Sequence, residues 1–109
     1  EDVNVEQVPP RCFCGGVLKP DFVFYGEGIP PLAYEKSLEM AQNADVMIIV
    51  GTAGQVMPAC SLPLTAKQFG AKIIEVNPLP SAFTDAVTDV YFPEKAGEFF
   101  ARLEKEMKL

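Results

Sequence analysis

Two short stretches of the sequence combine residue types that could hold a nucleotide. Gly51-Thr52-Ala53 follows the apolar run 46–50. Glycine lets the backbone approach a ligand closely, and free amide groups at a helix start can bind phosphate or sugar oxygens. Asn77 follows a second apolar run, where an acceptor-bearing side chain can hold a ribose hydroxyl. Each pattern also occurs in plain turns, so neither stretch assigns a ligand by itself.

A pair of cysteines, Cys12 and Cys14, precedes two glycines and looks like half of a zinc knuckle. A structural zinc ion needs four ligands, whereas the sequence has no histidine and only one further cysteine, Cys60, in a predicted helix. One residue separates the pair, where zinc ribbons usually have two. We therefore expect this chain alone not to close a zinc site. The lack of histidine also removes the commonest general base.

Composition excludes several classes of partner. The chain has 109 residues and a net charge of −6, with no run of Lys or Arg, so we expect neither nucleic acid nor an anionic membrane as a partner. It has no apolar stretch of about 18 residues, and hence no predicted membrane span. An odd number of cysteines with no secretory signal predicts a reducing, cytoplasmic location.

Hydrophobic periodicity and turn residues predict alternating strands and helices. Pro63 predicts a kink or a delayed start in the middle helix, and Gly70 predicts its end. The predicted strands are 22–25, 46–50, 72–76 and a weaker one within 87–92, and the predicted helices are 32–43, one from about residue 58, and one opening at residue 94 or 95.

This alternation predicts an α/β fold with a parallel sheet. In such sheets ligands lie outside the carboxyl ends of the strands, which is where Gly51, Thr52 and Asn77 fall. Four short strands would leave an apolar edge unpaired. We therefore expect the edge to be covered by a second copy of the chain, by another chain, or by a missing part of the same protein.

Taken in order, the motifs resemble those of the sirtuins, the NAD-dependent protein deacylases. Sirtuins commonly carry a cysteine pair, then Gly-Gly-x-Leu-Arg-Pro-Asp-x-Val-x-Phe-Gly-Glu. Residues 12–27 are similar, with Lys19 in place of the arginine and Tyr25 in place of the phenylalanine. The family's Gly-Thr-Ser and Val-x-Pro-Ala segments resemble residues 51–53 and 56–59, and the stretch 66–77 matches in register.

The resemblance implies a partial Rossmann-like, NAD-binding parallel sheet flanked by helices, with its N-terminal half missing. Residues 1–20 would be an irregular remnant of the zinc-binding module, and residues 21–109 the C-terminal half of the NAD-binding domain. The protein partner would be an acyl-lysine substrate.

The resemblance also implies site residues. Cys12 and Cys14 would supply half of a zinc site. The NAD-binding residues would be Gly51, Thr52, Ala53, Asn77, Lys95 and Ala96. The acyl-lysine peptide would contact Val23, Gly26, Glu27, Val56, Met57 and Pro58.

Departures from the family pattern predict a chain that does not catalyse alone. The family's glycine-rich phosphate turn, its Gln-Asn-x-Asp stretch and its histidine base are not in the sequence, and Ala53 replaces a usual serine. NAD binding should then be weak or absent. Two alternatives stay open: a non-catalytic adenine-nucleotide-binding or assembly module, and another nucleotide-binding α/β fold such as the central domain of thiamine-diphosphate enzymes.

Overall fold

The computed structural model describes residues 6–108. The chain divides into two compact units, Glu1–Pro30 and Pro31–Leu109, which we call the amino-terminal unit and the α/β unit. Each is described by itself. None of the helices within residues 6–108 is long and apolar enough to cross a membrane.

The amino-terminal unit is built from turns over its described residues, 6–30. An isolated antiparallel bridge joins Arg11 to Val17 and closes a tight turn around the cysteine pair. The predicted strand 22–25 is wrong, because the structure has no strand there. A strand needs a neighbour for its backbone groups, whereas the amide of Phe24 donates instead to the Glu27 side chain within its own loop.

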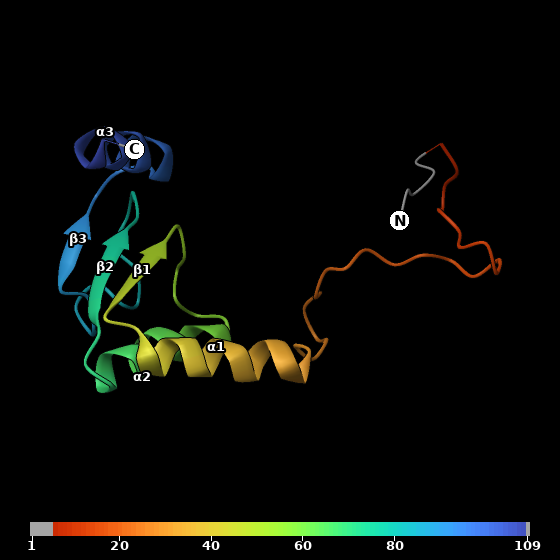
Figure 1. Cartoon of the computed structure of the whole chain (residues 1–109), viewed down its shortest axis with the longest axis horizontal. Helices are drawn as coiled ribbons and strands as arrows, with labels where there is room; N and C mark the ends of the chain where they lie inside the picture. Colours follow the sequence, from red (N-terminus) through yellow and green to blue (C-terminus); the bar gives the residue numbers. More distant parts are fainter. Residues whose placement is uncertain (1–5, 109) are drawn as a thin grey trace. The chain divides into compact units, whose positions relative to one another are not determined.

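The α/β unit follows the predicted order from its first helix onward (Figure 1). The middle helix starts late, as Pro63 predicts, because proline is tolerated only in a helix's first turn. Its end is followed by Gly70 at φ +101°, a conformation that favours glycine. The elements are α1 (Pro31–Asn43), β1 (Val46–Val50), a 3-10 turn (Ala59–Ser61), α2 (Leu62–Gln68), β2 (Lys72–Val76), β3 (Val90–Phe92) and α3 (Ala96–Met107).

The sheet is parallel, in the order β1-β2-β3, which confirms the predicted α/β class with three strands in residues 6–108. Val46 pairs with Lys72 at one end of the β1–β2 ladder, and Val50 with Val76 at the other. Glu75 pairs with Tyr91 across β2 and β3. Because the strands are parallel, their carboxyl ends lie at one edge, the same edge from which α3 continues the chain (Figure 1).

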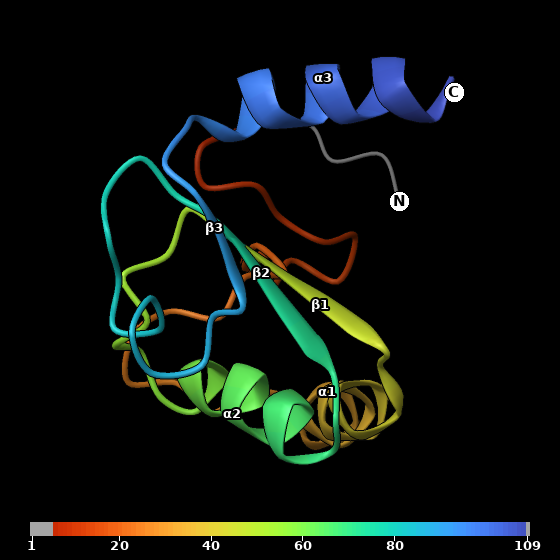
Figure 2. The same cartoon turned by 90° about the vertical axis from the view of Figure 1, so that its left-hand side faces the viewer.

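Helices α1 and α2 cover one face of the sheet, which we call the closed face (Figure 2). Alternate residues of the strands point to this face because the side-chain period of a strand is two. The segment between β2 and β3 has no helix and packs into the same core. The buried cluster comprises Ala41, Ile49, Ala66, Ala71, Ile73, Phe83 and Val87.

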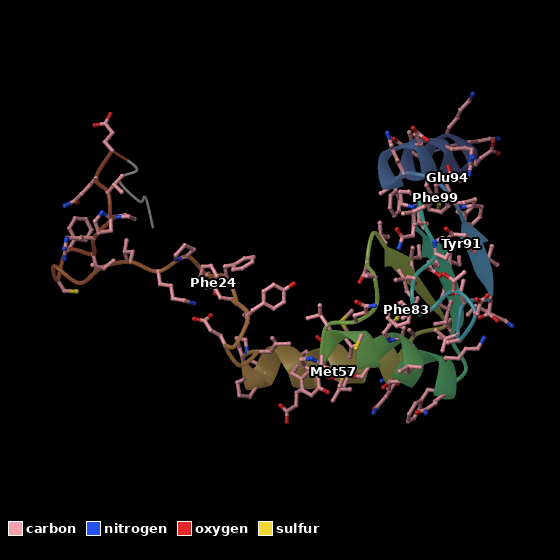
Figure 3. All side chains as sticks on the ribbon, turned by 180° about the vertical axis from the view of Figure 1, so that it is seen from behind. Phe24, Met57, Phe83, Tyr91, Glu94 and Phe99 are labelled. Atoms are coloured by element: carbon pink, nitrogen blue, oxygen red, sulfur yellow. The ribbon has the colours of Figure 1, made fainter. Side chains whose placement is uncertain are left out.

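The other face, the open face, is covered in part by α3. Phe99 lies on the side of α3 that faces the strands (Figure 3) and is buried. Its ring centroid lies 4.9 Å from that of Phe92 on β3. The β1 side chains on this face stay exposed, with Val46 at 51%, Ile48 at 42% and Val50 at 39%. The apolar run 46–50 is therefore covered on one face only.

Candidate functional site

The structure places the predicted nucleotide residues after three neighbouring strand ends. Gly51 follows β1 directly, Asn77 follows β2 directly, and Lys95 comes shortly after β3. The backbone amide of Gly51 donates to Val76 O at 3.0 Å, and the amide of Asn77 donates to Phe92 O at 3.1 Å. These hydrogen bonds continue the strand pairing by one residue and hold the carboxyl ends of the three strands together.

Asn77 and Thr52 are joined directly. Asn77 Nδ2 donates to the carbonyl oxygen of Thr52 at 2.7 Å, which uses one of its two protons and orients the side-chain amide. No donor within residues 6–108 reaches Asn77 Oδ1. Thr52 Oγ1 accepts the backbone amide of Gly54 at 3.1 Å, so its own proton can be donated outward. One acceptor and one hydroxyl donor thus face the same strand ends, a pair that suits sugar hydroxyls.

The turn after β1 depends on two glycines with positive φ. Gly51 has φ +60° and no atom within 4 Å of the position of an added Cβ, so its surroundings are open. Gly54 has φ +74°, and an added Cβ would lie 2.7 Å from the Phe83 ring. The turn is therefore open toward solvent at Gly51 and closely packed at Gly54.

Lys95 and Ala96 stand at the start of α3. Lys95 is extended at the helix N-cap, and its carbonyl oxygen accepts the amides of Glu98 and Phe99, both at 3.1 Å. The beginning of α3 is fixed by Arg102, which donates to Glu94 Oε1 at 2.6 Å. The helix therefore begins in a defined position on the chain segment that leaves β3.

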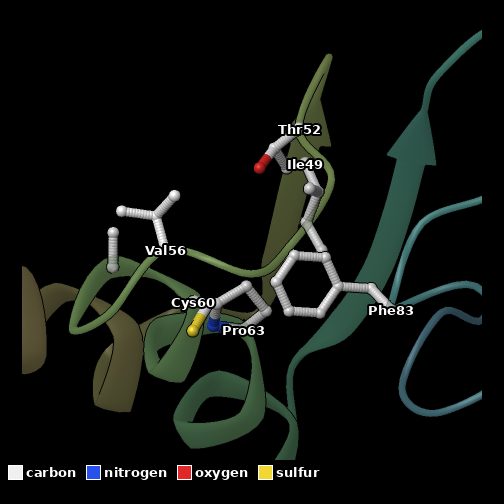
Figure 4. Close-up of a pocket in the computed structure, with 7 residues that line it drawn as sticks. Ile49, Thr52, Val56, Cys60, Pro63 and Phe83 are labelled. Carbon is white, nitrogen blue, oxygen red and sulfur yellow. The ribbon is translucent and has the colours of Figure 1, made fainter.

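A cavity of about 260 Å³ lies between the turn after β1 and the start of α2 (Figure 4). Thr52 and Val56, predicted for cofactor and for peptide respectively, both line it. The Phe83 ring lies beside Pro63 on another side of the cavity from Val56 (Figure 4). The remaining lining residues are Ile49, Ala59 and Cys60. The cavity is thus mainly apolar and borders both predicted binding stretches.

The Val56-Met57-Pro58 stretch is exposed at its first two residues, with Met57 the more open. The amide of Cys60 donates to Val56 O at 2.9 Å, and the amide of Ser61 donates to Pro58 O at 3.0 Å. The Cys60 thiol donates to Met57 Sδ at 3.1 Å. These bonds fix the stretch as a turn that leads into the 3-10 helix.

In the amino-terminal unit, Glu27 organises the loop that contains Gly26 and follows Val23. Its Oε2 accepts the backbone amide of Phe24 and the ammonium of Lys19, both at 3.0 Å. The Phe24 amide first and Lys19 second hold the pKa of the Glu27 carboxyl below its usual value. Lys19, which replaces the arginine of the family pattern, thus has a contact within the unit.

Cys12 and Cys14 are free thiols in one tight turn. Hydrogen bonds from the Gly16 backbone amide and the Cys12 thiol hold the pKa of the Cys14 thiol below its usual value. No group of three or more His, Cys, Asp or Glu side chains within residues 6–108 could hold a metal ion. The described residues do not fit a closed four-ligand zinc site, and half of such a site stays a prediction.

The environment of Glu75 was not predicted from the sequence. This residue of β2 is fully buried on the closed face, where its carboxylate accepts hydroxyl groups of Ser81, Thr84 and Thr88. The spacing of these hydroxyl residues after a strand was the only available signal. Its neighbour on β3, Tyr91, donates from Oη to Asn77 O at 2.9 Å.

Comparisons with known proteins match one family along most of the chain. A family model described as the Sir2 family matches residues 1–58. The chain is 45% identical over 108 residues to NAD-dependent protein deacylase 2 of Pyrobaculum aerophilum, covering 98% of this chain and 43% of that protein. It is 46% identical over 101 residues to the NAD-dependent protein deacylase of Aeropyrum pernix, covering 92% of this chain and 41% of that protein.

Solved structures are similar as well. Sir2Tm bound to a propionylated peptide matches with a TM-score of 0.81 and 29% identity, over 94% of this chain and 43% of that one. A Sir2 complex with a p53 peptide and NAD+ matches with a TM-score of 0.81 and 29% identity, over 94% and 42%. The chain spans about two fifths of the length of the curated relatives it matches.

Proposed function

Because the chain belongs to the Sir2 family, we propose that it contributes the adenosine side of an NAD site and the acyl-peptide loops of an NAD-dependent protein deacylase. The observation that carries this proposal is the bond from Asn77 Nδ2 to Thr52 O at 2.7 Å. It joins two strand ends and leaves Asn77 Oδ1 to accept a ribose hydroxyl.

The cofactor residues have distinct parts in this proposal. Gly51 allows the protein backbone to approach the nucleotide closely, Ala53 lies in the same turn, and Thr52 donates its hydroxyl. Lys95 and Ala96, at the start of α3, lie beside the adenine. NAD, when bound, supplies the ribose that receives the acyl group. The protein groups named here hold the adenosine half and take no part in bond making.

The peptide residues lie on two exposed loops. Gly26 and Glu27 belong to the loop held by Lys19, and the stretch 56–58 belongs to the turn before α2. In the proposed function each of these stretches contacts the acyl-lysine peptide, which binds as an added strand, and Val23 contacts the acyl chain. The relatives described with propionylated and p53 peptides support this proposal.

In this proposal the groups needed for catalysis lie partly in the stretch of the relatives that this chain matches and partly in the stretch that it does not match. The printed sequence contains no histidine, and the relatives extend well beyond the matched stretch. We place the general base and the phosphate-binding turn in that further stretch of the relatives, which would also cover the open edge of the sheet. The 109-residue chain should then give little turnover of an acetyl-lysine peptide with NAD. Robust turnover by the purified chain would contradict this division of labour.

Calorimetry with ADP-ribose tests the nucleotide site. The wild-type chain should bind weakly, and Asn77→Ala should lower the affinity at least about fivefold, the effect of one hydrogen bond. Asn43→Ala is a matched control, because Asn43 Nδ2 also donates to a backbone carbonyl, that of Glu39, at 2.8 Å. Equal affinities for the two variants would contradict the assignment of Asn77.

A second candidate function is an assembly module, favoured by the exposed apolar residues Val46, Ile48 and Val50. Light scattering separates this function from the first. A stable dimer that takes up no ADP-ribose at millimolar concentration would support assembly. A monomer that binds ADP-ribose would support the nucleotide site.

A further inference from the structure

We propose that Glu75 is a positioning residue for the nucleotide edge. Its buried carboxylate fixes residues 81–88, and this segment in turn holds the Gly51–Gly54 turn in shape. The functional part of this inference rests on the proposed nucleotide site. Its structural part concerns the turn alone and can be tested without a ligand.

The first step is the burial of a carboxylate without a cation. Glu75 is 0% exposed, and none of the ion pairs within residues 6–108 involves it. A buried carboxylate is costly unless hydrogen bonds satisfy its oxygens. Here Ser81 Oγ donates to Oε1, Thr84 Oγ1 lies 3.0 Å from Oε2, and Thr88 Oγ1 donates to Oε2 at 2.8 Å. All of the donors come from one segment.

The second step leads from that segment to the turn after β1. Ser81 Oγ accepts the amide of Phe83 at 3.1 Å, so the hydroxyl bound to Glu75 also orients Phe83. The amide of Ala82 donates to Ala53 O at 3.1 Å. The Phe83 ring fills the space beside Gly54. A change at the carboxylate would therefore reach the turn through Ser81, Ala82 and Phe83.

A shorter path leads from Glu75 to Asn77 through Tyr91. Glu75 and Tyr91 are paired across β2 and β3, and Tyr91 Oη donates to Asn77 O at 2.9 Å. Burial first, and the charge of Glu75 second, raise the pKa of Tyr91, so its hydroxyl stays protonated and able to donate. Tyr91 thus links the Asn77 backbone to the strand position beside Glu75.

An apolar side chain of similar size could fill the same space but could not order three hydroxyls. Directional acceptors give the 81–88 segment one arrangement. Without them we expect the segment to remain packed through Phe83 and Val87 while its link to Ala53 loosens. The expected defect is therefore in the shape of the turn, beyond any loss of overall stability.

Two variants and one control test this inference on the whole chain. Ser81→Ala removes one donor to Glu75 and the acceptor of the Phe83 amide. Glu75→Gln keeps the shape but replaces one acceptor oxygen with a donor. Ser37→Ala is the control, because Ser37 Oγ donates to Ala33 O within α1 at 2.7 Å, away from the carboxylate.

The first measurement is amide hydrogen exchange without ligand. We expect Ser81→Ala and Glu75→Gln to speed exchange of the Ala82 amide about 3–10-fold relative to the Lys72 amide, which donates to Asp45 O just before β1. Ser37→Ala should leave this ratio unchanged. An unchanged ratio in both test variants, or an equal rise at both amides, would overturn the inference.

The second measurement is the affinity for ADP-ribose, where a loss of about 3–10-fold is expected for Ser81→Ala and none for Ser37→Ala. If the wild-type chain binds no ADP-ribose, the proposed nucleotide site fails while the exchange ratio still decides the role of Glu75. If the wild-type chain binds and Ser81→Ala binds equally well, the positioning role is overturned.

Discussion

The two faces of the sheet are built on the same strands but are covered very differently. The closed face has α1, α2 and the 81–88 segment against it, and Ile73 there is 0% exposed. The open face has only α3 over part of its area, and Ile48 there is 42% exposed. The closed face therefore holds the larger buried cluster, and the 81–88 segment packed against it also bonds to the turn after β1.

Replacing one isoleucine on each face should give the largest difference in the free energy of unfolding. Ile73→Ala on the closed face should lower the free energy of unfolding by about 2–5 kcal/mol, since it removes buried methyl groups and leaves a cavity. Ile48→Ala should cost less than half as much, because its side chain is already partly in water. Urea unfolding measures both, and equal losses would refute the distinction between the faces.

Two glycines in the turn after β1 test whether the closed face reaches the strand ends. Gly51→Ala should cost about 1–2 kcal/mol from its positive φ alone. Gly54→Ala should cost more, because its new Cβ would also collide with the Phe83 ring. Thermal unfolding of the two variants compares them under matched backbone strain. If Gly51→Ala is the more destabilised variant, Phe83 does not brace the turn.

Lowering the pH should have the smallest of these effects on stability, through Asp89 at the edge of the closed face. Asp89 accepts Lys67 Nζ at 2.6 Å and the Ile73 amide at 2.8 Å, and these bonds, that from Lys67 first, hold its pKa below the usual value. Its stabilising contribution is therefore complete above its unfolded-state pKa of about 3.9 and is lost as pH falls through the lower folded value.

Asp89→Asn, which cannot ionise, should remove this pH dependence. Between pH 7 and pH 3 the variant should lose less unfolding free energy than the wild-type chain. Urea unfolding at both pH values provides the comparison. An identical loss in the two proteins would mean that the Lys67–Asp89 pair does not contribute to acid stability.

Periodicity predicts the elements of the α/β unit well, because each of them carries its own signal. The unbroken apolar run 46–50 and the proline at 63 act locally, and the structure confirms both the strand and the delayed helix. The aromatic run 22–25 carries a similar signal, yet it forms no strand. Whether an apolar run becomes a strand depends on a neighbour that the run itself does not encode.

Prediction of the candidate site from the sequence is limited in the same way. The positions of Thr52 and Asn77 after strands are predictable from the sequence, whereas the bond between them depends on strand order. Glu75 could not be assigned at all, because a carboxylate on a sheet face is stable there only once hydroxyls from a later segment surround it. Tertiary hydrogen bonding, which has no local pattern, decides its role.

We propose that this chain holds adenosine at the carboxyl ends of its strands. Amide chemical shifts of the nitrogen-15-labelled chain, followed during titration with ADP-ribose, test this proposal. We expect saturable shifts at Gly51, Thr52 and Asn77, with smaller ones at Ala96 on α3. Shifts confined to the open face at Val46 and Ile48, or no saturable shifts at all, would contradict it.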